Sequence, residues 1–347
     1  MSLGSIAFLG SGETSLAGGR IFEHIAKQIN APVRIALLET PAGFELNSPQ
    51  VAGRVADFLK TRLQNFDPQI DVIPARKKGS AFSPDDPEIC APLLRANLIF
   101  MGAGSPTYAI RQLSGSLAWD IVRARQRLGA ALVFASAATI AASAVALPVY
   151  EIFKVGMDVH TVPGLDFFAD FASPLSFIPH WNNTDGGADV DTSRCFIGME
   201  RFAQWCDLLP NGHTTVGLDE HTGIVIDFEK DEVEVVGVSS VSLVRECDPK
   251  IFPSGTTFPL RELGPCCLAD GPATGIPPSV WELVRSAPSP DPVIDDLPLA
   301  EALRLAGERQ AARERKDWAA ADEYRRLIAA LGWTVQDTPE GPKLTKT

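Results

Sequence analysis

The sequence is poor in basic residues relative to acidic ones. It has 31 Lys and Arg against 43 Asp and Glu, a formal net charge of −12 over 347 residues. Proteins that bind nucleic acid or anionic membranes through charge need a basic face, so the overall charge argues against both classes and leaves only a local basic patch open. No apolar run approaches the ~20 residues that span a bilayer, and no membrane partner is predicted.

Histidine is scarce and the cysteines follow no ligand pattern. There are five His and six Cys, with neither a C-x-x-C pair nor an H-E-x-x-H segment, so we predict no metal site and no cofactor. Scattered cysteines are typical of reduced thiols. The start, MSLGSIAFLG, lacks the charged residues and long apolar core of a signal peptide. Together these features predict a cytoplasmic protein.

What the first 150 residues do contain is an alternation of apolar runs and helical patterns. Buried strands are predicted at 5–13, 33–43, 97–104 and 130–137. Continuous apolar strands separated by helices predict a mostly parallel sheet covered on both faces, an α/β fold. Such sheets bind ligands at the carboxyl ends of their strands, which here are the small-residue turns GSGE, ETPAG, MGAGSP and ASAAT.

The rest of the chain divides into two further parts. Alternating residues at 214–246 predict an antiparallel meander that completes an α/β domain over 1–250. Residues 251–297 are rich in Pro and Gly, which predicts a linker. Residues 298–347 show two helical patterns and predict a separate helical hairpin. Truncation after about residue 260 is therefore expected to leave the α/β domain folded.

Ser136 follows one of the predicted strands and is surrounded by alanines. A serine at a tight strand-to-helix turn exposes its hydroxyl as a nucleophile, and small neighbours make the tight turn sterically feasible. The same serine could equally be a helix N-cap or a packed small residue. The local residues leave both interpretations open.

Four segments in order resemble the dipeptidase E and cyanophycinase family of serine peptidases. They are MGAGSPTYAIRQL with Gly104, VFASAATIA with Ser136, FIPHWNN with His180, and VGLDEHTGIVID. Glu151, fifteen residues after Ser136, stands where dipeptidase E has its acidic triad member. The resemblance covers about residues 5–245 and implies the three-layer α/β sandwich of class I glutamine amidotransferases.

The resemblance also implies roles for individual residues. Ser136 would be the nucleophile, His180 the base and then the acid, and Glu151 the carboxylate that orients the imidazole. The implied activity is a serine-type hydrolase of small peptides, with aspartyl-containing peptides among the candidates. The oxyanion would be held by the backbone N–H of Ala137 together with that of Gly104 or Ser105.

Other residues compete for these roles. His160 is the rival base, Asp158 and Asp166 are substitutes for Glu151, and Arg111 and Arg194 are candidates to bind a substrate carboxylate. Phe134 and Ala138 replace glycines of the family's serine turn, and Ser105-Pro106 departs from its G-G-N segment. These departures leave a second hypothesis, a catalytically inactive scaffold that binds a ligand, a protein or tRNA.

The last 50 residues resemble the C-terminal helical domain of cysteinyl-tRNA synthetases. The matching positions are Arg309, Arg313, Lys316, Asp317, Trp318, Ala321, Asp322, Arg325, Gly332, Asp337, Thr338 and Gly341. The resemblance implies a weak tRNA contact through 298–347. From residue 299 onward there are nine Lys or Arg and eight Asp or Glu, a balance that argues against tight RNA binding and favours a structural or protein-interaction module. A homodimer is left open.

Overall fold

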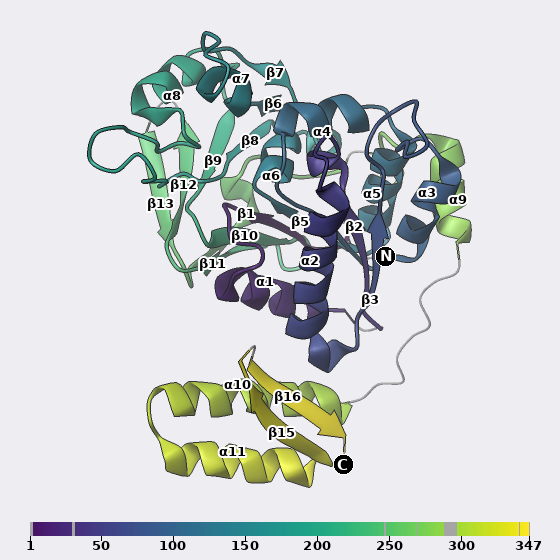
Figure 1. The fold of residues 1–347 in the computed structure, drawn as a ribbon, viewed down its shortest axis with the longest axis vertical. Helices are drawn as coiled ribbons and strands as arrows, with labels where there is room; N and C mark the ends of the chain where they lie inside the picture. The colour runs from purple at the N-terminus through teal and green to yellow at the C-terminus, as the bar shows by residue number, and fades with distance from the viewer. Residues whose placement is uncertain are drawn as a thin grey trace.

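The computed structural model describes residues 3–29, 32–245, 248–268, 270–287, 297–339 and 341–346. Its centre is an eight-stranded sheet in the order β14-β11-β10-β1-β5-β4-β2-β3 (Figure 1). The neighbours among β1, β5, β4, β2 and β3 run parallel, and the remaining pairs are antiparallel. The predicted mostly parallel α/β sheet is confirmed. The strands are β1 (Ile6–Leu9), β2 (Arg34–Leu38), β3 (Gln69–Ile73), β4 (Leu98–Met101), β5 (Ala131–Ala135), β10 (Thr222–Asp227), β11 (Glu232–Gly237) and β14 (Thr257–Pro259).

Each face of this sheet is covered by helices. On one face, Ala7, Leu37 and Val133 pack with α1 (Leu16–Ala26) and α2 (Ser48–Arg62). On the other, the alternate strand residues pack with α5 (Leu117–Arg127) and α9 (Pro278–Ser286). Strand side chains point alternately to the two faces, so continuous apolar strands are buried on both sides. The short helices α3 (Pro87–Cys90) and α4 (Pro106–Leu113) lie between β3 and α5 in the chain.

A second sheet of four strands, in the order β13-β12-β9-β8, lies beside the first (Figure 1). The 214–246 region therefore does not form one meander: β9 and β12 pair in this sheet, whereas β10 and β11 pair in the large one, and residue 246 lies outside the described residues. The added elements are β6 (Val145–Ala146), β7 (Val162–Pro163), β8 (Leu175–Ile178), β9 (Thr214–Leu218), β12 (Ser240–Arg245), β13 (Asp248–Pro253), α6 (Ala137–Ala141), α7 (Val149–Phe153) and α8 (Gly198–Cys206).

The predicted linker at 251–297 is wrong over most of its length. Strands β13 and β14 belong to the two sheets, and Leu263, Ile276 and Val284 are buried in the main core. The Arg123 guanidinium, ion-paired with Asp170 at 2.5 Å, also donates to the Gly275 carbonyl. Pro278 is compatible with this order because it occupies the first turn of helix α9, where a helix tolerates proline. Residues 288–296 of the predicted linker lie outside the described residues.

The C-terminal module contains more than the predicted helical hairpin. Helices α10 (Leu297–Glu314) and α11 (Trp318–Ala330) are followed by the hairpin of β15 (Trp333–Thr338) and β16 (Gly341–Lys346). Ala302, Leu305 and Ile328 form a core of their own together with residues of the hairpin. Figure 1 shows the module beside the α/β domain rather than within it.

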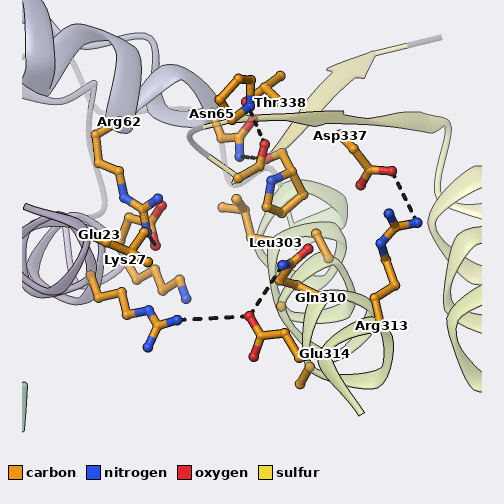
Figure 2. A pocket seen from close by; sticks show the side chains of 18 of the residues that line it. Glu23, Lys27, Arg62, Asn65, Leu303, Gln310, Arg313, Glu314, Asp337 and Thr338 are labelled. Carbon is orange, nitrogen blue, oxygen red and sulfur yellow. Dashed lines mark hydrogen bonds and ion pairs between the residues drawn. The ribbon is translucent and has the colours of Figure 1, made fainter. Parts of the chain in front are cut away.

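The module meets the α/β domain through polar contacts. The Asn65 side-chain amide donates to the Pro342 carbonyl at 2.9 Å and accepts from the Leu344 N–H at 2.7 Å, as a neighbouring strand would. Arg20 and Glu314 approach to 4.0 Å across a cleft of about 540 Å³ (Figure 2).

Among the described residues, no helix has the length and apolar character to cross a membrane.

Candidate functional site

Ser136 lies at the carboxyl end of β5, at the turn into α6. Its backbone has φ +51° and ψ −113°, a conformation that L-residues rarely adopt. The Thr139 hydroxyl fixes the turn by donating to the carbonyls of Leu9 and Phe134 at 3.1 and 3.0 Å. Strained backbone at a strand-to-helix turn is the geometry that holds a nucleophilic serine out from a sheet.

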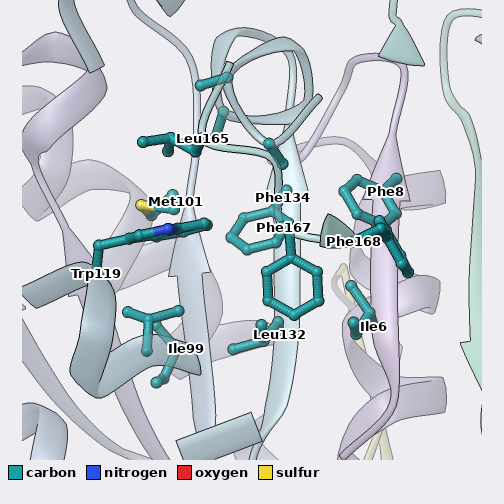
Figure 3. Packing of buried hydrophobic residues seen from close by; sticks show 14 of the residues in the cluster. Ile6, Phe8, Ile99, Met101, Trp119, Leu132, Phe134, Leu165, Phe167 and Phe168 are labelled. Carbon is teal, nitrogen blue, oxygen red and sulfur yellow. The ribbon is translucent and has the colours of Figure 1, made fainter. Parts of the chain in front are cut away.

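Phe134, two residues before Ser136, points into the core and away from the turn. Its side chain is fully buried and lies near the rings of Phe8, Trp119 and Phe167, as Figure 3 shows. The phenylalanine that stands where the resembled peptidases have glycine therefore does not obstruct the serine. Ala138 is a buried residue of α6, where the chain has no need of glycine.

The structure brings His180 and Ser136 together. The distance between Ser136 Oγ and His180 Nε2 is 2.9 Å, within hydrogen-bonding reach. His180 follows β8 at φ +49°, and its backbone N–H donates to the Gly10 carbonyl just beyond β1. The two strands β1 and β5 are paired, so this contact places the imidazole over the end of β5.

The carboxylate on the far side of the imidazole is Glu220, not Glu151. Glu220 Oε1 lies 3.1 Å from His180 Nδ1 and also accepts from the Asn183 amide at 2.9 Å. Glu151, on α7, instead accepts from the Thr107 hydroxyl at 2.6 Å. Glu220 lies in the segment VGLDEHTGIVID. It could not be identified from the sequence, because the spacing after Ser136 pointed to an earlier acid.

Glu220 is held in its ionised form. Partial burial alone raises the pKa of a carboxyl group, but the hydrogen bonds from Asn183 and His180, with the electrostatic attraction to His180 and His221, outweigh it and lower the pKa of Glu220 below its ordinary value. An ionised carboxylate at Nδ1 holds a proton there, which leaves Nε2 free to accept one.

Of the backbone N–H groups predicted to hold the oxyanion, that of Ser105 already has a hydrogen-bond partner. Ser105 donates its N–H to the Pro41 carbonyl at 2.8 Å, and its hydroxyl caps α4 by accepting from Tyr108 N, so its backbone is already used. Ala137 is the first residue of α6, and the first N–H groups of a helix have no partner within it. Gly104 has φ +146°, and a Cβ there would lie 2.0 Å from Pro41 O, so only glycine fits.

The rival residues are occupied elsewhere. His160 Nδ1 lies 2.9 Å from the carbonyl of Asp158. Arg111 lies over the Tyr108 ring at 5.2 Å, and Arg194 stacks on Trp181 at 3.9 Å while donating to its carbonyl. Within the described ranges, no group of three or more His, Cys, Asp or Glu side chains is arranged to hold a metal ion.

Comparison with known proteins supports the fold and, separately, the C-terminal module. No family model matches the chain. The solved structure of a peptidase from an acI-B1 actinobacterium superposes with a TM-score of 0.59 at 19% identity, covering 74% of this chain and 97% of that one. The α/β domain therefore shares the fold of that structure.

Cysteine–tRNA ligases match a stretch about as long as the module. Cysteine–tRNA ligase 1 of Burkholderia lata is 54% identical over 54 residues, 15% of this chain and 11% of the ligase. The ligase of Methanosarcina mazei is 51% identical over 47 residues, 14% of this chain and 10% of the ligase. The chain thus spans about a tenth of the length of these ligases.

Proposed function

We propose that the chain is a serine-type hydrolase of small peptides. The observation that carries the proposal is the hydrogen-bonded series Ser136–His180–Glu220 at the carboxyl end of the central strand β5. A nucleophile, a base within hydrogen-bonding reach and a third group that orients the base are the three parts of acyl transfer by serine.

In this mechanism Ser136 Oγ attacks the scissile carbonyl carbon while His180 Nε2 takes the hydroxyl proton. The imidazolium then gives that proton to the leaving amine as the carbon–nitrogen bond breaks, and an ester on Ser136 remains. A water molecule hydrolyses the ester by the same proton transfers. Glu220 stabilises the imidazolium in both halves of the reaction.

The negative charge on the substrate oxygen needs backbone donors. We assign the Ala137 N–H and, from the segment after β4, the Gly104 N–H to this role. Loss of one such donor typically costs ~3 kcal/mol of transition-state stabilisation. Aspartyl peptides remain predicted substrates, with the binding group for their side-chain carboxylate unassigned.

The decisive experiment is covalent labelling with a fluorophosphonate probe. We expect wild-type protein to be labelled, Ser136→Ala to be unlabelled, and His180→Ala to be labelled far more slowly. Ser80→Ala, at an exposed serine away from the turn, is the matched control and should label as wild type does. Equal labelling of Ser136→Ala and wild type, or none of wild type, would refute the proposal.

The similarity to cysteine–tRNA ligases supports a second role, a weak tRNA contact through the module. Arg309 and Arg313 are both ion-paired with Asp337, and Arg304 with Glu301, so part of the basic charge is neutralised internally. Weak binding that falls with added salt is expected. A mobility-shift titration with tRNA tests this contact. The double variant Arg315→Gln with Lys343→Gln, at two exposed positions, should bind tRNA more weakly than wild type. Unchanged binding argues against the contact.

A further inference from the structure

The serine and the histidine of the site can be reached from outside the protein. Between residues 130 and 143, all of which the structure describes, only Ser136 is partly exposed, and its neighbours are buried. The His180 side chain keeps 18% of its surface exposed. A substrate can therefore approach both groups, and it then meets the side chains that lie beside the imidazole.

Two phenylalanine rings form a row from this imidazole to the surface. The ring centroids of His180 and Phe196 are 5.4 Å apart, and those of Phe196 and Phe153 are also 5.4 Å apart. Phe196 is half-buried, whereas Phe153 is 40% exposed. Val155 and Met157, which follow Phe153 in the chain, are exposed as well. The surface that continues from the imidazole through this phenylalanine row, Phe196 and Phe153, is therefore apolar.

The backbone that presents the Phe196 ring is strained. Arg194, Cys195 and Phe196 have φ values of +57°, +60° and +68°, three successive non-glycine residues in the left-handed region. Bulky residues rarely adopt this conformation, and it persists only where surrounding contacts fix it. The Cys195 N–H donates to the His180 carbonyl at 3.1 Å, and the Arg194 N–H donates to the Trp181 carbonyl at 2.9 Å. These contacts tie the strained segment directly to the histidine of the site.

Helix α7, which bears Phe153, also contacts the other side of the site. Glu151, on the same helix, accepts a hydrogen bond from the Thr107 hydroxyl at 2.6 Å. Thr107 lies in the first turn of α4, three residues after Gly104, whose N–H we assign to the oxyanion. The phenylalanine row and α7 together therefore form a continuous border from His180 to the segment that supplies an oxyanion donor.

The chemistry of the proposed reaction determines which part of the substrate meets this border. His180 Nε2 gives its proton to the leaving amine, so the amine nitrogen must lie beside the imidazole at that step. The side chain of the leaving residue is attached one carbon away from that nitrogen. It therefore lies close to whatever packs beside the imidazole, which here is the Phe196 ring.

We infer that the phenylalanine row binds the side chain of the residue that leaves as the amine, and that the site prefers a large apolar side chain, aromatic or aliphatic, at that position. Removing such a side chain from water against aromatic rings stabilises the complex, and glycine at that position gains nothing from it. This inference rests on the proposed hydrolase function, because proton transfer from His180 fixes where the leaving amine lies. It is independent of the residue on the acyl side of the scissile bond.

Peptides that differ only in the leaving residue test this preference. Aspartyl-phenylalaninamide is compared with aspartyl-glycinamide, and alanyl-phenylalaninamide with alanyl-glycinamide, by measuring kcat/KM for release of the amine. In a pair that wild type hydrolyses, the phenylalanine peptide should exceed the glycine peptide at least about tenfold. Leucine in place of phenylalanine should retain most of this preference. Equal values of kcat/KM within a pair would overturn the inference.

The main test variant is Phe153→Ala, because a side chain that is 40% exposed can be removed without unfolding the domain. It should lower the preference for phenylalanine over glycine at least about threefold, mainly by raising KM for the phenylalanine peptide. Phe196→Ala should remove the preference. Phe82→Ala is the matched control and should keep it, since Phe82 is 42% exposed and follows β3, which β4 and β2 separate from β5. An unchanged preference in both Phe153→Ala and Phe196→Ala would overturn the inference.

A second readout separates this inference from the proposed function, and it decides the question if neither peptide pair is hydrolysed. A product amine binds where the leaving amine departs. Phenylalaninamide should therefore protect Ser136 from fluorophosphonate labelling at a concentration at least about tenfold lower than glycinamide, and Phe153→Ala should narrow the difference. Labelling without this difference overturns the inference and leaves the nucleophile in place. Absence of labelling in wild type overturns the proposed function itself.

Discussion

Glu220 Oε1 lies 3.1 Å from His180 Nδ1, although the two residues are separated by 40 positions in the chain. Glu220 sits in the turn between β9 and β10, and these strands belong to different sheets. The carboxylate therefore reaches the imidazole only once both sheets have formed. This dependence gives the site a separate structural origin for each of its three groups: β5 for the serine, β8 for the histidine and the β9–β10 turn for the acid.

Glu220→Gln should slow fluorophosphonate labelling of Ser136 by roughly 10³–10⁴-fold, because an amide can hold the imidazole in the wrong tautomer and cannot stabilise its positive charge. Glu151→Gln is the matched control and should slow labelling by less than about tenfold. Labelling rates of both variants, with thermal melts to establish folding, test this. A larger loss for Glu151→Gln would restore the acid implied by the resemblance.

Phe134→Ala should destabilise the α/β domain by about 3–5 kcal/mol, because it removes a fully buried ring from the centre of the main core. Phe153→Ala, at a side chain that is 40% exposed, should change the free energy of unfolding by less than about 1 kcal/mol. Urea unfolding of both variants measures the difference. Equally small changes in the free energy of unfolding for the two variants would mean that the Phe134 ring contributes little to the packing of the core.

The sheet and the serine turn could be predicted because both depend on the pattern of neighbouring residues in the sequence. Apolar runs such as 131–135 mark strands buried on both faces, and small residues after Ala135 mark a tight turn. Glu220 could not be placed, since its partner depends on how two sheets are arranged. The Pro-rich segment after residue 250 is not the linker that its composition predicts. A high content of Pro and Gly indicates which backbone conformations are favoured, but it does not indicate whether Ile276 or Val284 is buried.

That misassignment has a direct consequence for truncation. A chain ending at residue 287 should keep the melting transition of the α/β domain, because it retains β14 and α9. A chain ending at residue 260 should be insoluble or melt at a much lower temperature, because it loses Leu263, Ile276 and Val284 from the core. Thermal melts by circular dichroism compare the two. Equal transitions would show that the segment contributes little to stability.

The stability of the C-terminal module should depend on pH through Asp337. The hydrogen bond from Arg309 lowers the pKa of Asp337 below its ordinary value of 3.8; burial opposes the shift, and the charges of Arg309 and Arg313 add to it. A carboxyl group whose pKa is lower in the folded state stabilises that state at pH values above 3.8, and this contribution is lost as the pH falls through the lowered value. Asp337→Asn should therefore lower the melting temperature of the module at pH 7, and the difference from wild type should shrink steadily below pH 3.8. Asp322→Asn, at an exposed position of α11, is the matched control, and its melting temperature should match that of wild type at pH 7 and below pH 3.8. A difference between Asp337→Asn and wild type that stays constant from pH 7 to pH 2 would show that Asp337 acts through shape rather than through charge.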